Sequence, residues 1–239
     1  MWEENDDLLA IDKPGWIVCH PSKNGPFSSL VGACKEYLQA ETLHLVSRLD
    51  RETSGIVLIA KHRAAARRLQ MALQERAVEK TYFAILEGEL AEPVEVDQRL
   101  AKDLESPVGA KVTVRRSNSS QRAITHFTPL VSAKGVTLAK VSPVTGRKHQ
   151  IRAHAEWLGH RIVGDKIYGP DARLFLEFIE HGFTPNLANN LLMRRQALHA
   201  GELRFADGDC FRAPLAWDMA QFCREEMEIE PDLFTGLST

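Results

Sequence analysis

Short apolar runs alternate with polar stretches along the chain, and the spacing of the apolar residues changes from segment to segment. Alternating or continuous apolar runs predict strands at 8–11, 16–19, 43–49, 56–60, 81–86, 94–100, 111–115, 122–130, 135–144 and 198–205. Spacings of three and four residues predict helices at 28–39, 62–77, 148–159 and 215–228. Because strands outnumber helices and gather in the middle of the chain, we predict an α+β fold with a mostly antiparallel sheet.

Local signals mark the ends of some of these elements. Ser28 or Ser29 is placed to cap the first helix, and the pair 207–208 (Asp-Gly) predicts a hairpin turn. Residues 171–195 fit no single element, because helical spacing at their start is interrupted by Gly182 and Pro185.

The composition is that of a globular protein. The chain has 239 residues, of which 44% are hydrophobic and 26% charged, and no linker or repeat divides it, so we predict one domain over residues 1–239. The acidic N-terminus has no apolar core, and no apolar run is long enough to span a bilayer. We therefore expect a soluble, cytoplasmic protein. Its four cysteines lack metal-ligand spacing, so we expect buried or half-buried thiols and no zinc site or disulfide framework.

Charge is unevenly distributed although the formal net charge is only −2. Residues 61–80 and residues 140–168 each carry six basic and two acidic side chains, and acidic residues gather at both ends of the chain. Two interpretations stay open. The basic stretches are either ordinary solvated helix faces, or a basic cleft that faces phosphates while the acidic termini turn away.

The densest polar segment, residues 47–55, connects two predicted strands. It carries Asp50 at a strand end with Arg48 and Arg51 close by. A neighbouring guanidinium keeps a carboxylate ionised, and an ionised carboxylate serves as a nucleophile or a base. The alternative is a solvated turn held by a salt bridge.

A second polar segment covers residues 145–154. Its Thr145-Gly146 start predicts a helix N-terminus, which attracts anions. On that helix we expect His149, Arg152 and Glu156 to share a face from which a basic residue pairs with a buried carboxylate, unless they form a plain cationic surface. His149 and His154 lie five residues apart, which does not suit a metal site.

These two segments together resemble a known family. Residues 45–55 resemble the H-R-L-D-x-x-T-S-G signature of RluA-type pseudouridine synthases, and residues 145–152 resemble their T-G-R-x-H-Q-I-R signature. Four further matches follow the family order: 12–15 with D-K-P-x-G, 80–82 with K-x-Y, 159–169 with G-H-P-I-x-G-D-x-x-Y-G, and 198–205 with L-H-A-x-x-L-x-F. The likeness covers roughly residues 8–217.

The resemblance implies an isomerase that converts uridine to pseudouridine in ribosomal or transfer RNA, without cofactor or metal. It implies the pseudouridine synthase fold, with a mixed sheet in two lobes and a catalytic cleft between them. Asp50 would be the catalytic carboxylate, Tyr82 the tyrosine that stacks on the base, and Arg152 the partner of the catalytic carboxylate. Whether Asp50 attacks as a nucleophile or removes a ribose proton is left open.

The same resemblance assigns further substrate contacts. Arg48 matches the arginine linked to flipping of the target nucleotide, and Ile151 and Leu203 match apolar positions that line the pocket. We expect Arg147 and His149 to contact the substrate as well. Extrusion of a stacked base costs a few kcal/mol, which an inserted arginine and an aromatic platform partly recover. The expected partner is structured RNA, with no membrane and no protein partner, and the expected state is a monomer.

Three departures from the family pattern bear on recognition. Ser47 stands where the family has His, Arg161 stands where it has Pro, and we expect no S4-like RNA-binding domain before the likeness. RNA recognition is then expected from the catalytic domain itself or from residues 170–196, which are either a substrate-contacting insertion or a packing helix pair. Residues 218–239 are expected to form an acidic C-terminal helix and tail.

Two other functions are alternatives to this one. A non-catalytic RNA-binding relative would be expected to have lost Asp50, Tyr82 or Arg152, and all three are present. A glycoside hydrolase using Asp50 and Glu52 would need its carboxylates roughly 5–9.5 Å apart across a sugar, which residues two apart reach only in a special loop. We therefore favour the synthase.

Overall fold

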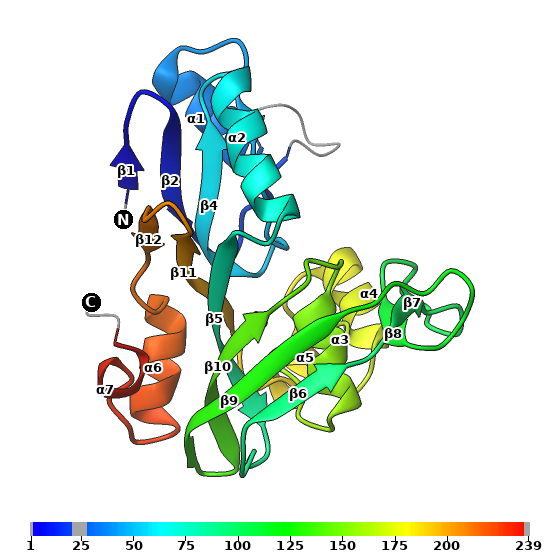
Figure 1. Ribbon diagram of the computed structural model, residues 1–239. Coiled ribbons are helices and arrows are strands. Elements are labelled where there is room, and N and C mark those ends of the chain that lie inside the picture. Colours follow the sequence, from blue (N-terminus) through cyan, green and yellow to red (C-terminus); the bar gives the residue numbers. More distant parts are fainter. Residues whose placement is uncertain (1, 21–27, 237–239) are drawn as a thin grey trace. The chain divides into compact units, whose positions relative to one another are not determined.

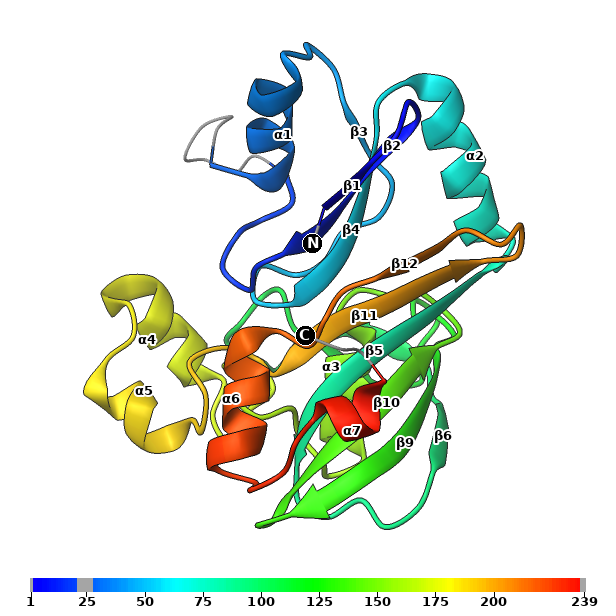
Figure 2. The ribbon, with the colours of Figure 1, turned by 90° about the vertical axis from the view of Figure 1, so that its left-hand side faces the viewer.

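The computed structural model describes residues 2–20 and 28–236 (Figures 1 and 2). Its strands are β1 (Trp2–Glu4), β2 (Leu8–Lys13), β3 (His44–Leu45), β4 (Ser54–Ala60), β5 (Val78–Glu87), β6 (Val94–Asp97), β7 (Leu100–Lys102), β8 (Val112–Val114), β9 (Ile124–Ala133), β10 (Val136–Pro143), β11 (Leu198–Phe205) and β12 (Cys210–Arg212). Its helices are α1 (Leu30–Leu38), α2 (Arg63–Gln74), α3 (Gln150–Trp157), α4 (Arg173–His181), α5 (Pro185–Asn190), α6 (Trp217–Glu225) and α7 (Asp232–Thr235).

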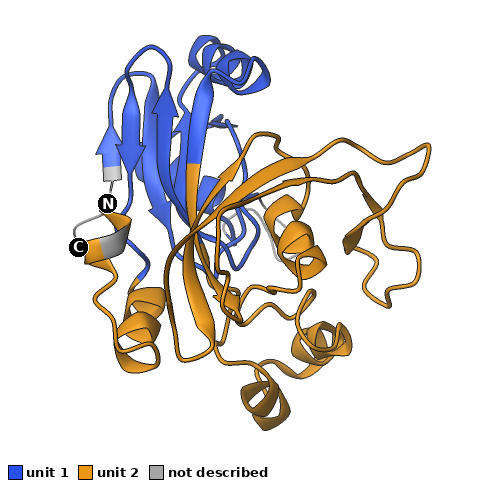
Figure 3. Cartoon of the chain, turned by 60° about the horizontal axis from the view of Figure 1, so that its bottom comes forward, with its two compact units in different colours: residues 1–80, 199–216, 237–239 blue, residues 81–198, 217–236 orange. Residues whose placement is uncertain are grey.

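The chain divides into two compact units (Figure 3). Unit 1 comprises residues 1–80, 199–216 and 237–239, and unit 2 comprises residues 81–198 and 217–236. The strand order is β1-β2-β4-β11-β5-β10-β9-β6, and the boundary between the units falls within β5 and within β11. β4 pairs with β11 in parallel, whereas β1–β2, β2–β4, β5–β10, β10–β9 and β9–β6 pair antiparallel. The predicted α+β fold with a mostly antiparallel sheet is confirmed.

The sheet of unit 1 carries a helix on each face. Successive side chains of a strand point to opposite faces, so each strand divides its apolar residues between two cores. Ile56 and Leu58 of β4 pack with Leu69 of α2, while Val57 and Ile59 pack with α1. Every residue of β4 is buried as a result, which explains why its sequence is continuously apolar.

Unit 2 packs helix α3 against the small β7–β8 hairpin. Ala153 of α3, Leu100 of β7, Val108 of the hairpin loop and Tyr168 share one apolar cluster. At the other end of this unit, Arg195 donates twice to Asp218 at the start of α6, at 2.6 Å for each contact. Helix α6 is therefore tied to the segment that leads into β11.

Some predicted elements differ from the observed ones. No strand forms at 16–19, where Val18 makes only an isolated bridge to Ser29 and the carbonyl of Ile17 accepts from a lysine. The predicted strand 43–49 shrinks to β3, because the chain leaves β4 after Val46 donates to Leu58. The predicted strand 94–100 splits into β6 and β7, and Ser29, not Ser28, caps α1.

The predicted helices end earlier than their apolar spacing suggested. Helix α2 stops at Gln74, since Arg76 adopts φ 59° and Ala77 turns back to donate to Ala72. The C-terminal helix α6 stops at Glu225 instead of 228.

Residues 170–196 contain the helix pair that was one of the two interpretations. Leu174 of α4 packs with Leu187 of α5 and with Leu191, and Phe178 and Phe183 flank them. Contact of this segment with a substrate stays a prediction.

Two smaller expectations concern thiols and membranes. All four cysteines are free thiols, three buried and Cys210 half-buried, as predicted. Burial raises the pKa of Cys34 to about 11 and of Cys223 to about 12. Within the described ranges, no helix combines the length and apolar character needed to cross a bilayer.

The close approach of β4 to β11 yields a first prediction. Gly55 has φ +104°, and a Cβ atom there would lie 2.2 Å from the carbonyl oxygen of Ala200. Gly55→Ala should therefore lower the free energy of unfolding by about 3 kcal/mol or more, as measured by urea denaturation. Gly109→Ala is the control, because its Cβ would meet nothing within 4 Å. Equal stability of the two variants would contradict this account.

Candidate active site

The loop that carries Asp50 joins β3 to β4, and a buried lysine binds its backbone just after Asp50. The Lys13 side chain is fully buried, and its Nζ donates to the carbonyls of Pro14, Ile17 and Arg51 at 2.8, 2.9 and 3.0 Å. An ammonium has three donors, so each of them finds a carbonyl acceptor. The backbone immediately after Asp50 is thereby fixed to the segment that follows β2.

A cysteine contacts the loop backbone just before Asp50. Cys19 Sγ lies 3.5 Å from the carbonyl oxygen of Leu49 and 3.4 Å from its amide nitrogen. The Thr53 amide donates to the Asp50 carbonyl at 3.2 Å and closes a turn. Asp50 is half-buried, so it is a carboxylate on a backbone restrained from both sides.

The loop ends at Thr53, because Ser54 already belongs to β4. The Ser54 hydroxyl lies 3.0 Å from Nδ1 of the buried His199. His199 of β11 thus fastens the end of the loop to the neighbouring strand. Arg48, at the start of the loop, is exposed.

Unit 2 carries Tyr82 and the segment around Arg152. Tyr82 is half-buried in β5 and pairs with Val141 of β10. The 145–149 loop is folded by Gln150, whose Oε1 accepts from the Thr145 hydroxyl at 2.6 Å and from the Arg147 amide at 3.0 Å. The Gln150 Nε2 donates to the Ile124 carbonyl at 2.8 Å, which ties the loop to β9.

Arg152 is buried and forms a two-pronged ion pair. Its Nε and Nη2 donate to the two carboxylate oxygens of Asp165 at 2.6 and 2.8 Å. The backbone amides of Ile167 and Tyr168 also donate to Asp165, at 2.9 and 3.1 Å. Burial alone would raise the pKa of Asp165, but the charge and hydrogen bonds of Arg152 and these amides outweigh it and hold that pKa below its ordinary value.

The helix after residue 145 departs from its prediction. It begins at Gln150, because His149 adopts φ 52° and Thr145 is engaged with Gln150. His149 therefore lies before the helix, whereas Arg152 and Glu156 lie within it. Its Nδ1 lies 3.1 Å from the Tyr168 hydroxyl, while His154 contacts Thr125, so the two histidines have separate partners.

The remaining predicted residues divide between the units. Ile151 of α3 and Leu203 of β11 are almost fully buried, and Leu203 belongs to the apolar core that α2 covers. Arg147 is exposed. Arg48, Asp50 and Leu203 thus lie in unit 1, and Tyr82, Arg147, His149, Ile151 and Arg152 in unit 2.

The interpretation in which the acidic termini turn away from the basic stretches does not hold at the N-terminus. Glu4 pairs with Lys61 at 2.7 Å, and Asp7 contacts both Arg68 at 2.8 Å and His62 at 3.0 Å. The β1–β2 hairpin packs beside β4 and places its acids next to the start of α2. Part of the first basic stretch is therefore neutralised within unit 1.

Several residues that organise the site carry no sign of that role in the sequence. Lys13, Gln150 and Asp165 lie in segments that carry the family resemblance, but the sequence offers no sign that each holds the backbone or a side chain elsewhere. The only available signal was their place within those segments.

Comparison with known proteins identifies the family. The sequence model of the RNA pseudouridylate synthase family matches residues 7–157 of this chain. The uncharacterized RNA pseudouridine synthase YjbO of Bacillus subtilis is 33% identical over 93% of this chain and 75% of its own length. The ribosomal large subunit pseudouridine synthase C of Vibrio vulnificus is 35% identical over 84% of this chain, which spans 59% of that protein.

A solved structure agrees with this result. The human RNA pseudouridylate synthase domain containing 4 superposes with a TM-score of 0.74 and 26% identity, covering 93% of this chain and 90% of that one. The chain belongs to the RNA pseudouridine synthase family, as its motifs indicated. It is therefore an isomerase that acts on uridine in RNA.

The Arg152–Asp165 pair leads to a prediction of pH-dependent stability. Asp165→Asn keeps acceptors for the two backbone amides but leaves the Arg152 charge buried without its carboxylate. We expect a loss of about 3–5 kcal/mol in unfolding free energy at pH 7. Because the folded pKa of Asp165 is depressed, the contribution of the pair is complete above the unfolded pKa of about 3.9 and is lost as pH falls through the lower folded value.

Urea unfolding of both proteins between pH 3 and 7 measures this difference. The difference in unfolding free energy between wild type and Asp165→Asn should become smaller below about pH 4. The exposed Asp209→Asn serves as the control and should follow the wild-type profile. A constant difference across the whole range would contradict the assignment.

Proposed function

We propose that this chain converts uridine to pseudouridine in large-subunit ribosomal RNA, with Asp50 as the catalytic carboxylate. The observation that carries the proposal is the restraint of the Asp50 loop, whose backbone is held at Leu49 by Cys19 and at Arg51 by Lys13. A catalytic group needs a fixed position more than a solvated turn residue does. The names of the related ribosomal enzymes support the choice of RNA.

In this proposal the reaction conserves all atoms. The bond between ribose C1′ and uracil N1 breaks, the base turns, and C1′ bonds to C5, whose proton is released while N1 gains one. Asp50 acts on the ribose either by attack at C1′ or by removal of a proton. Both routes require the ionised carboxylate, and the family resemblance gives Arg152, which Asp165 binds within unit 2, the role of favouring that form.

The other residues receive roles by the same proposal. Tyr82 would stack on the extruded uracil, Arg48 would occupy the space that the base leaves, and Ile151 and Leu203 would provide apolar walls. Arg147 and His149 would contact the RNA beside the target.

An exposed basic surface on unit 2 supports RNA binding. We define the arginine patch as Arg99, Arg115, Arg122, Arg147 and Lys148, all of which are exposed. Two pairs of its members are in contact, because Arg147 Nε donates to the Arg122 carbonyl at 3.2 Å and the Arg115 amide donates to the Arg99 carbonyl at 3.0 Å. The Arg122 side chain also forms an ion pair with Asp97 at 2.8 Å. Three of these residues lie outside the stretches that the sequence singled out.

The catalytic role is tested in cells that lack the gene. RNA is treated with a carbodiimide that tags pseudouridine, and reverse-transcription stops are mapped. We expect one or more stops in large-subunit ribosomal RNA to vanish, to return with wild type, and to stay absent with Asp50→Asn. Glu41→Gln, an exposed carboxylate near the loop, should restore them.

Purified Asp50→Asn should still bind the unmodified transcript. Restoration of the stops by Asp50→Asn would refute the catalytic assignment. Binding without any modification by wild type would favour the non-catalytic relative, and a vanished stop in transfer RNA would move the substrate there.

The arginine patch gives a separate prediction on affinity. Each phosphate contact releases counterions, so log Kd depends linearly on log salt concentration. Arg115→Gln and Lys148→Gln should each weaken RNA binding and reduce that slope by about one. Arg224 lies on α6 and pairs with Glu230, and Arg224→Gln should change neither the affinity nor the slope. Unchanged slopes in both patch variants would place the RNA elsewhere.

A further inference from the structure

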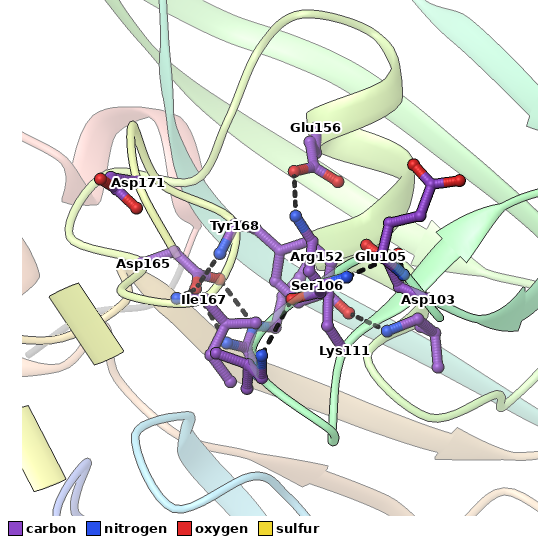
Figure 4. Close-up of polar contacts among 12 residues, drawn as sticks. Asp103, Glu105, Ser106, Lys111, Arg152, Glu156, Asp165, Ile167, Tyr168 and Asp171 are labelled. Carbon is purple, nitrogen blue, oxygen red and sulfur yellow. Dashed lines mark hydrogen bonds and ion pairs between the residues drawn. The ribbon is translucent and has the colours of Figure 1, made fainter. Parts of the chain in front are cut away.

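A fully buried tyrosine lies beside two cationic side chains in unit 2 (Figure 4). The guanidinium carbon of Arg152 lies 4.9 Å from the centre of the Tyr168 ring, and Nζ of Lys111 lies 5.1 Å from it. Cations at these distances are attracted by the electron-rich face of an aromatic ring. The two cations come from different elements, α3 and the β7–β8 hairpin.

Each cation also has its own carboxylate. Arg152 is bound by Asp165, and Lys111 by Glu156 of α3 at 2.7 Å. Arg152 and Glu156 lie one helical turn apart, so α3 contributes one member to each ion pair. The ring of Tyr168 thus lies among four charged groups whose charges balance.

The Tyr168 hydroxyl links the same elements a second time. It accepts from the Val112 amide at 3.0 Å, and it lies 3.1 Å from Nδ1 of His149, to which it donates when that nitrogen is unprotonated. Burial raises the pKa of the phenol, so the hydroxyl keeps its proton. One side chain therefore connects Arg152, the start of α3 and the β7–β8 hairpin.

We propose that Tyr168 is a positioning residue of the isomerisation, which holds Arg152 in place and couples it to the β7–β8 hairpin. The proposal rests on the proposed function, because it assumes that Arg152 serves the catalytic carboxylate. Asp165 binds one edge of the guanidinium, and the ring, which its two hydroxyl contacts hold in place, lies beside the same group. A guanidinium held in both ways has little freedom to turn away from a substrate.

A purely structural role would not require the hydroxyl. Tyr168 packs in an apolar cluster with Leu100, Val108 and Ile167, where phenylalanine would fill the same space. A buried hydroxyl must instead find partners, and here both partners belong to segments next to Arg152. Tyr168→Phe therefore keeps the apolar packing and the ring, and removes the hydroxyl contacts to Val112 and His149 that hold the ring beside Arg152.

The test compares Tyr168→Phe with Tyr37→Phe, which alters a largely exposed tyrosine of α1 in unit 1. Single-turnover pseudouridine formation on the transcript and RNA affinity are measured for both. We expect Tyr168→Phe to react about tenfold more slowly with unchanged affinity, since small displacements of a catalytic group are costly. Tyr37→Phe should match wild type.

A second measurement does not depend on activity. Hydrogen exchange of the Arg152 Nε–H, identified by its loss in Arg152→Lys, should be about tenfold faster in Tyr168→Phe, because the hydroxyl contacts to Val112 and His149 no longer hold the ring beside the guanidinium. Slow reaction together with fast exchange supports the proposal. Fast exchange with a wild-type rate, or a slow reaction with wild-type exchange, overturns it.

The two proposals fail in different ways. If wild type forms no pseudouridine on any RNA offered, the proposed function fails, and the exchange measurement still decides whether Tyr168 restrains Arg152. If wild type is active and Tyr168→Phe equals it in rate and exchange, only the positioning role is refuted.

Discussion

The buried ammonium of Lys13 is the constraint on which the Asp50 loop depends. Removal of a charged amine from water is costly, and here three backbone carbonyls compensate for it. Those carbonyls belong to Pro14, Ile17 and Arg51, so one side chain joins two chain segments 38 residues apart. The carbonyls of Pro14 and Ile17 turn inward to meet it, and the segment between them forms a turn where its apolar residues predicted a strand. The geometry around Asp50 thus follows from satisfying a single buried charge.

Unit 2 also contains a buried charge, which is compensated by a different set of groups. Arg152 is buried beside Asp165, and Gln150 uses both ends of its amide to fold the loop before α3. Polar networks of this kind are costly when one member is missing and rigid when all are satisfied. The residues that carry the family resemblance therefore include scaffolding groups as well as those proposed to touch RNA. Tyr168 extends this network to the β7–β8 hairpin.

Charge is also distributed by the fold in a way that composition does not reveal. The acids of the β1–β2 hairpin neutralise part of the 61–80 stretch, whereas Arg115 and Lys148 of the arginine patch in unit 2 are exposed. Electrostatic attraction to RNA falls off within a Debye length of about 8 Å at physiological salt, so local exposure matters more than the net charge of −2. The basic surface of unit 2 is consistent with phosphate contacts that position an RNA without reading its sequence.

The sequence by itself determined the α+β class, the continuous burial of β4, the amphipathic face of α2 and the place of Asp50 in a loop between strands. These depend on local spacing, since apolar periodicity selects the element and the element selects the buried face. The family membership followed from motifs read in order, and comparison with relatives confirmed it.

Only the tertiary structure decided the partners of Lys13, Gln150 and Arg152, the late start of α3 at Gln150, and the neutralisation of Lys61 and Arg68. Each depends on a hydrogen bond or ion pair between residues that the fold brings together, and such contacts leave no periodic trace along the chain.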